Sequence, residues 1–161
     1  MRSMSIIFGA MLFLLLSGCS NSETSDLKEI GFYAVTSGKS HHQSFKEYGS
    51  GSTKRTLPAT DYSEIPVLKQ GDYFLVYGDL PAGLMGTSVE VFSYRLDGNI
   101  YKSKGGDLSL ESFFSQEPME PLRGVKLTKL TPKSSITVGT YFLHRYVGMN
   151  GDAYLAFQIR R

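Results

Sequence analysis

Short runs of strand-forming residues recur along most of this chain, and glycine-rich turns separate them. The 161 residues include ten Tyr, ten Phe and 17 Gly, while long runs of helix-favouring Ala, Glu, Lys and Leu are absent. Tyrosine and phenylalanine are enriched in strands, and glycine supplies the conformations that tight turns need. We therefore expect an all-β domain, a β-sandwich of about seven to nine strands.

Several segments have the composition of strands, and one has the pattern of a helix. The strand candidates are Glu29–Thr36, Asp72–Gly78, Ser88–Leu96, Asn99–Ser103, Arg123–Leu130, Thr140–Tyr146 and Ala153–Arg160. Asp97-Gly98 lies between two of them and predicts a tight hairpin. Apolar residues recur at helical spacing in Ser109–Ser115, and Pro118 and Pro121 prevent further helix. At most one short helix is expected.

The chain also contains an internal similarity. Leu68–Leu75 (LKQGDYFL) resembles Ile136–Leu143 (ITVGTYFL), and a weaker match relates Gly83–Val89 to Gly148–Tyr154. These matches predict a pseudo-repeated sandwich with one hairpin from each half, although chance similarity between β-rich segments is the alternative. A tyrosine two residues after a glycine also occurs in the tyrosine corner of immunoglobulin-like sandwiches, where its hydroxyl bonds to the backbone upstream. An immunoglobulin-like topology is therefore one candidate.

The first residues have the parts of a secretory signal. Arg2 is followed by an apolar run, Ile6–Leu16, and then by Leu16-Ser17-Gly18-Cys19. The run is too short for a bilayer-spanning helix, which needs about 20 residues. Leu16–Cys19 resembles the lipobox of bacterial lipoproteins at every position. The resemblance implies cleavage of residues 1–18 and attachment of lipid to Cys19, while an ordinary signal with a chance cysteine is the alternative.

Lipidation would account for the cysteine content and would fix the location of the domain. Cys19 is the only cysteine of the chain, and a lone thiol has no intramolecular partner in an oxidising compartment. Two or more acyl chains anchor a protein stably, so we expect membrane lipid to be a partner through Cys19. Residues 19–26 are polar and predict a tether, and residues 27–161 predict one domain. In lipoproteins of diderm bacteria, Ser20 after the cysteine implies the outer membrane, facing the periplasm.

Motifs for common catalytic chemistry are absent from the sequence. There is no Gly-x-Ser-x-Gly, no phosphate-binding glycine loop and no dinucleotide-binding glycine pattern. His41 and His42 are adjacent, so on an extended chain they point in opposite directions, and His144 is expected on an exposed strand face. The carboxylates, Asp61 and Glu64 among them, are scattered and are interpreted as turn formers and solvated faces. No metal site and no cofactor is expected.

Two segments are candidates for contact with a partner. Leu80, Leu84 and Met85 belong to an apolar loop, which either folds back over the domain or inserts into a partner or the bilayer. Ser37–Thr56 is a polar loop or long hairpin, and its basic residues could touch anionic headgroups or an envelope polymer, or could simply be solvated. The basic candidates are Lys39, Lys54 and Arg55.

These observations favour a non-enzymatic interaction module, anchored by lipid in the cell envelope, whose partner is an unknown protein or polymer. Removal of Arg2 with the signal leaves 16 basic residues, one fewer than the 17 of the whole chain, against 15 acidic ones, so nucleic acid is not expected as a partner. Two alternatives stay open. One is an envelope hydrolase whose carboxylates come from separate strands, and the other is a carrier of an apolar ligand.

Overall fold

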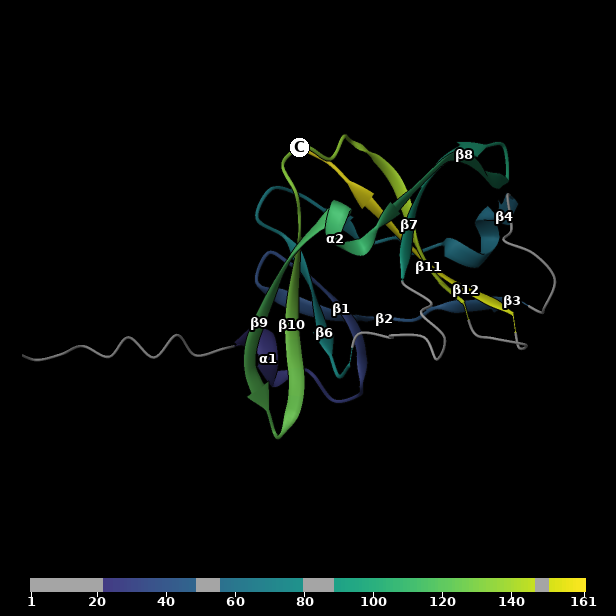
Figure 1. Cartoon of the computed structure of the whole chain (residues 1–161). Helices are drawn as coiled ribbons and strands as arrows, with labels where there is room; N and C mark the ends of the chain where they lie inside the picture. The colour runs from purple at the N-terminus through teal and green to yellow at the C-terminus, as the bar shows by residue number, and fades with distance from the viewer. Residues whose placement is uncertain (1–21, 49–55, 80–88, 147–150) are drawn as a thin grey trace, which may run out of the picture.

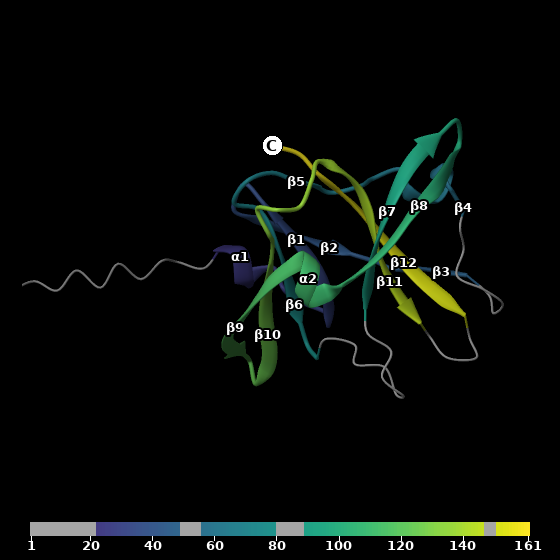
Figure 2. The ribbon, with the colours of Figure 1, turned by 45° about the horizontal axis from the view of Figure 1, so that its top comes forward.

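A computed structural model describes residues 22–48, 56–79, 89–146 and 151–161, and within them the chain forms two β-sheets (Figures 1 and 2). The first sheet has five strands, in the order β2 (Lys39–Gln43), β1 (Gly31–Thr36), β6 (Tyr73–Tyr77), β10 (Val125–Pro132) and β9 (Phe114–Leu122). The second has seven strands, in the order β3 (Lys46–Tyr48), β12 (Asp152–Ile159), β11 (Gly139–Tyr146), β7 (Glu90–Asp97), β8 (Ile100–Ser109) and β4 (Thr56–Pro58), with β5 (Val67–Leu68) also paired to β12. The all-β prediction is confirmed.

The described strands outnumber the seven to nine that the sequence predicts. Every predicted strand has a counterpart, and the additional ones are short or lie at sheet edges, where alternation of apolar and polar residues is weak. β9 was not predicted because it contains Pro118 and Pro121, which an edge strand tolerates. The distribution of strands between the sheets also differs from that of immunoglobulin domains.

In the part of the chain that the structure describes, three short helical turns join or flank the strands, where at most one helix was expected. They are α1 (Ser22–Ser25), the 3-10 turn η1 (Ala59–Tyr62) and α2 (Leu110–Phe113). α2 falls inside the predicted segment, and the side chain of Ser109 caps it by accepting a hydrogen bond from the Ser112 amide. It carries the chain from β8 in one sheet to β9 in the other, so the helix marks the crossing between layers (Figure 1).

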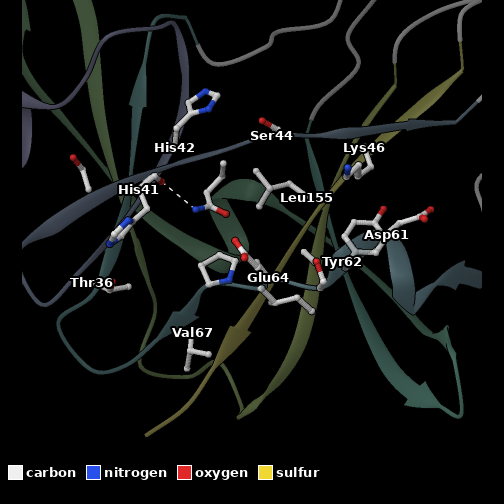
Figure 3. A pocket seen from close by; sticks show the side chains of 16 residues that line it. Thr36, His41, His42, Ser44, Lys46, Asp61, Tyr62, Glu64, Val67 and Leu155 are labelled. Atoms are coloured by element: carbon white, nitrogen blue, oxygen red, sulfur yellow. Dashed lines mark hydrogen bonds between the residues drawn. The ribbon is translucent and has the colours of Figure 1, made fainter.

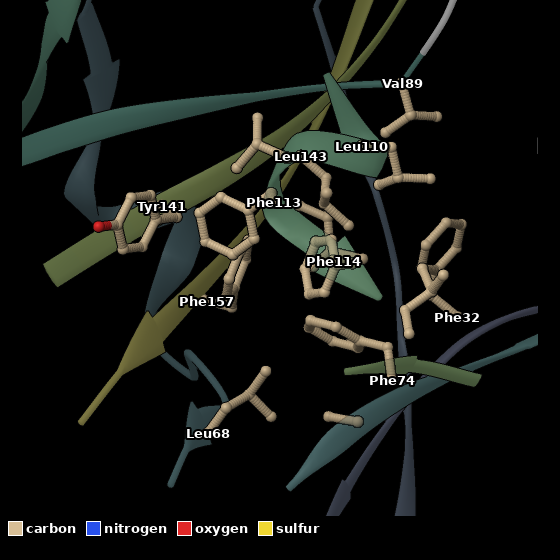
Figure 4. Packing of buried hydrophobic residues seen from close by; sticks show 14 of the residues in the cluster. Phe32, Leu68, Phe74, Val89, Leu110, Phe113, Phe114, Tyr141, Leu143 and Phe157 are labelled. Carbon is tan, nitrogen blue, oxygen red and sulfur yellow. The ribbon is translucent and has the colours of Figure 1, made fainter. Parts of the chain in front are cut away.

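The two sheets pack face to face, and aromatic rings fill the space between them (Figure 4). Phe113 and Phe114 from the α2–β9 junction meet Tyr141 of β11 and Phe157 of β12, while Phe74 contributes from β6. The ring centroids of Phe113 and Tyr141 are 4.8 Å apart, and those of Phe74 and Phe157 are 5.4 Å apart. Burial of each such side chain contributes about 1.5–3 kcal/mol, so this cluster is the main stabilising element.

The outer faces of the sheets are also covered. On the seven-stranded sheet, Tyr62 of η1 packs on Phe142 with ring centroids 4.9 Å apart, within a second cluster that includes Tyr94 and Tyr101. On the five-stranded sheet a third cluster includes Tyr33. β6 and β12 are therefore largely buried on both faces, which removes the two-residue alternation expected for a half-exposed strand.

The polar segment before Leu27 does not extend freely from the domain as a tether along its whole length. α1 lies against the outer face of the five-stranded sheet, where Glu23 contacts the hydroxyl of Tyr73. Leu27 is fully buried, and Arg123 donates a hydrogen bond of 3.3 Å to its carbonyl oxygen. The cause is the apolar outer face of this sheet, which needs a cover, so the domain begins within the predicted tether.

The internal similarity does not correspond to a duplicated hairpin. β11 and β12 pair as neighbours, but β6 and β7 belong to different sheets, because the chain after β6 crosses from one layer to the other. A tyrosine corner does form at one of the two positions: the hydroxyl of Tyr141 donates to the Thr137 carbonyl oxygen at 2.9 Å. Tyr33 makes the same bond to Glu29 at 2.8 Å, whereas Tyr73 bonds Glu23 instead. The repeated sequence therefore specifies a local strand start, and not a repeated pairing.

Candidate functional site

A groove of about 870 Å³ lies between β2 and the segment from η1 to β5 (Figure 3). One wall runs along β2 and on to Lys46 in β3, and the other is residues 61–67. Leu155 of β12 lies between the two walls, and Ala156 also lines the groove. The groove arises because the chain leaves the five-stranded sheet after β2 and joins the seven-stranded sheet at β3, so the two layers separate along this side.

The two walls carry side chains of opposite charge. Lys46, an exposed cation, lies on the β2–β3 wall, together with the imidazole of His41. Asp61 and Glu64 lie on the opposite wall. A ligand with both a negative and a positive group would therefore find a partner for each, and salt would weaken these contacts because the charges are partly solvated.

A small hydrogen-bond network holds Asp61 in place at one end of the groove. The hydroxyl of Tyr48 donates to a carboxylate oxygen of Asp61 at 2.9 Å, and the hydroxyls of Tyr48 and Tyr62 are 3.0 Å apart. Since Tyr48 has one proton to donate, Tyr62 is the donor in the second bond. Burial, followed by the contact with Asp61, raises the pKa of Tyr48 to about 12, and burial raises the pKa of Tyr62 further. Both tyrosines thus stay neutral donors, and they tie η1 to β3.

The adjacent histidines point in opposite directions, which confirms the prediction for an extended chain (Figure 3). His42 packs its ring on Tyr33, with centroids 5.0 Å apart, and its Nε2 lies above Gly31 on the outer face of the sheet. His41 projects from the other side of the strand. Among the described residues, no three His, Cys, Asp or Glu side chains come together in a way that could hold a metal ion.

His144 was expected on an exposed face, and the structure shows that this is wrong. The residue is 6% exposed, its Nε2 lies 2.8 Å from Asp152, and its Nδ1 lies 3.6 Å from Glu90. The ring stacks on Tyr154 with centroids 4.8 Å apart. The reason is that the outer face of the seven-stranded sheet faces the second aromatic cluster instead of solvent, so a polar residue there needs buried partners.

Most of the sequence-predicted contact residues lie outside the described residues. This holds for the lipidation candidate and for both contact loops: Cys19, Lys54, Arg55, Leu80, Leu84 and Met85. Lys39 is described, is exposed, and begins β2 next to the groove without lining it. The basic segment that contains it is neither one loop nor one hairpin up to Tyr48, because β2 pairs with β1 and β3 pairs with β12.

The sequence analysis did not bring the groove residues together. Asp61 and Glu64 were assigned to turns, and no element was predicted between Thr56 and Leu68. The run Ala59–Val67 has no usable periodicity, since η1 and β5 are each too short to show one. Only the pairing of β5 with β12 places this run opposite β2.

The apolar-carrier hypothesis requires an interior space for its ligand. Instead, rings occupy the region between the sheets that the described residues enclose, and the groove has charged walls (Figure 4).

Within the described residues, no helix has both the length and the apolar character that a bilayer crossing requires. Comparison with known proteins identified no matching family model, no matching curated sequence and no matching solved structure.

Proposed function

We propose that this chain is a binding module of the bacterial cell envelope, held on a membrane by lipid attached to Cys19, and that the groove is its binding site. The observation that carries the proposal is the groove itself, which has walls of opposite charge beside the edge of a sheet. Sites of this volume are typical of ligand recognition, and a few charged groups on the walls supply orientation and specificity.

The start of the domain supports a position close to the lipid. α1 begins at Ser22, three residues after Cys19, and the chain from Glu23 onward is bonded to the five-stranded sheet. An extended chain spans at most about 3.6 Å per residue, so Ser22, where α1 begins, lies within about 11 Å of the acylated cysteine. In a diderm host the module would face the periplasm from the outer membrane.

Metabolic labelling with an alkynyl fatty acid tests the anchor. The wild-type chain is expected to incorporate label and to fractionate with membranes, whereas Cys19→Ala is expected to lose both properties. Label in the Cys19→Ala variant, or none in the wild type, would contradict lipidation at Cys19.

Photo-crosslinking in intact cells tests the groove as a binding site. A photoreactive residue at Ser63, which is exposed in the groove wall, is compared with the same residue at Ser115, which is exposed on β9. We expect a discrete adduct from position 63 that is absent from position 115. Equal labelling from both positions, or none from either, would count against a specific site in the groove.

A hydrolase is the second candidate, because Asp61 and Glu64 line the same groove. Asp61 accepts a hydrogen bond from Tyr48, which suits a fixed carboxylate, and Glu64 is exposed, which suits contact with a substrate. Hydrolysis of the ligand identified by crosslinking, with loss of that activity in Glu64→Gln, would favour the hydrolase. Binding without turnover would favour the module.

A further inference from the structure

The groove wall formed by β2 is a sheet edge with unused backbone groups. Within the described residues, β2 pairs with β1 on one side and with no strand on the other. The hairpin turn at Ser37-Gly38, where both residues have positive φ (51° and 72°), determines which β2 residues point their backbone N–H and C=O groups toward β1. In such a turn the amide of Lys39 bonds to the carbonyl of Thr36, so it faces β1.

Successive residues of a strand direct their backbone N–H and C=O groups to opposite sides, so the direction at Lys39 fixes the direction at each later residue of β2. His41 and Gln43 face β1 with Lys39, whereas Ser40 and His42 present their N–H and C=O groups away from the sheet. An independent bond supports this parity, because the amide of Gly78 donates to Lys126 at 2.8 Å, and the registers from β10 through β6 to β1 then lead to the same assignment. Ser40 and His42 both line the groove.

The opposite wall presents backbone groups as well. The amides of Gln158 and Arg160 donate to the carbonyls of Pro66 and Leu68, respectively, at 2.9 Å each. The carbonyls of Pro66 and Leu68 therefore face β12. Val67 lies between them, and in a parallel ladder its N–H and C=O groups therefore point away from β12. Val67 lines the groove opposite β2 (Figure 3).

We infer that the ligand of this groove is an extended peptide segment of a partner protein, which adds to the edge of β2 as a further strand. This inference deepens the function proposed above and rests on it. Backbone hydrogen bonds to Ser40 and His42 supply affinity, and alternate side chains of the peptide supply specificity. An acidic side chain fits beside Lys46, and a basic one fits beside Asp61 or Glu64 on the other wall.

A peptide fits these walls better than a glycan does. Sugar rings are commonly bound against the open face of an aromatic side chain, and the aromatic residue of the groove, Tyr62, is 8% exposed and packed on Phe142. Rows of outward backbone donors and acceptors, in contrast, match the spacing of another strand. The edge of β2 also lacks the prolines found at the other edge of the same sheet, on β9.

The test uses the full chain, purified from cells in detergent, and a phage-displayed library of random peptides of about ten residues, the length of a long strand. The best-enriched peptide is synthesised, and its affinity is measured for wild type, Ser40→Ala and Ser40→Pro. Proline at residue 40 removes an outward N–H and leaves the bonds to β1 in place. Alanine is the matched control, because it keeps that N–H and because the buried Ser40 hydroxyl has no hydrogen-bond partner.

We expect Ser40→Ala to bind within about twofold of wild type and Ser40→Pro to lose about tenfold or more, since it loses a hydrogen bond and adds a steric clash at the edge. Methylation of single peptide amides supplies a second measurement should Ser40→Pro fail to fold. Loss at alternate peptide positions is expected from strand pairing, and loss without that alternation would overturn the inference.

The crosslinking result separates this inference from the proposed function. A protein adduct at position 63 together with an enriched peptide supports both. A sugar-polymer adduct at that position, with no peptide enriched, keeps the groove as a binding site and overturns the peptide. An absence of adducts in cells overturns the proposed binding function, even if a peptide binds to the purified chain.

Discussion

The two edges of the five-stranded sheet differ in how they are protected from pairing. The β9 edge carries Pro118 and Pro121, which have no N–H to offer, and also Glu117 and Glu120. Prolines and charges are the usual means by which an edge strand avoids association with another chain. The β2 edge has no proline, begins with Lys39, and borders a groove instead of open solvent. The contrast indicates that one edge is closed to pairing while the other stays available in a confined place.

Proline substitution in β2 should separate the two sides of the strand, and it has the largest expected effect. His41→Pro removes an N–H that bonds to β1 and is expected to cost about 3 kcal/mol of unfolding free energy, whereas Ser40→Pro removes an outward N–H and should cost clearly less. Chemical denaturation monitored by circular dichroism measures the difference. Equal losses for the two variants would show that the assigned parity is wrong.

Replacement of the β9 prolines should make the two edges more alike. The double variant Pro118→Val and Pro121→Val restores two N–H groups on an exposed edge and is expected to promote self-association with little loss of stability. Sedimentation velocity at several concentrations measures it, and Ser115→Val on the same strand is the control. A strictly monomeric double variant would mean that these prolines do not protect the edge.

The contact between β3 and the groove wall opposite β2 should respond to alkaline pH. The folded state raises the pKa of Tyr48 from 10.0 to about 12, so it favours the neutral phenol. The resulting stability is fully present below pH 10 and is lost as the pH rises through about 12. Tyr48→Phe also loses the bond to Asp61 and should cost about 1 kcal/mol at neutral pH. Unfolding curves measured between pH 7 and 12 test both effects, and a curve that Tyr48→Phe leaves unchanged would argue against this contact.

Charge on the groove walls should have the smallest effect. Glu64→Gln is expected to weaken binding of a selected peptide with a basic residue by about twofold to fivefold, because exposed ion pairs contribute up to about 1 kcal/mol. The effect should shrink at high salt. Glu120→Gln on β9 is the matched control, and an equal change there would assign the effect to net charge instead of to the groove.

The residues that distinguish the two edges were visible in the sequence, but their structural roles could not be predicted from it. Pro118 and Pro121 were interpreted as the end of a helix. Proline indicates that a helix cannot continue through it, but it does not indicate which strand contains it. His41 and His42 were correctly expected to diverge, because that follows from an extended backbone alone. Asp61 and Glu64 gave no signal, because their importance depends on a strand more than ten residues away that faces them across the groove.

By itself, the sequence determined the local features of this protein: the all-β class, most of the long strands, the capped turn α2 and a tyrosine corner at Tyr141. These depend on propensity, periodicity and bonds between residues close in the chain. Tertiary structure alone decided that β6 and β7 lie in different sheets, that His144 is buried, and that β2 and β5 lie across a groove from each other. The physical reason is that strand pairing and side-chain burial depend on contacts between segments distant in the sequence, which the local sequence pattern does not specify.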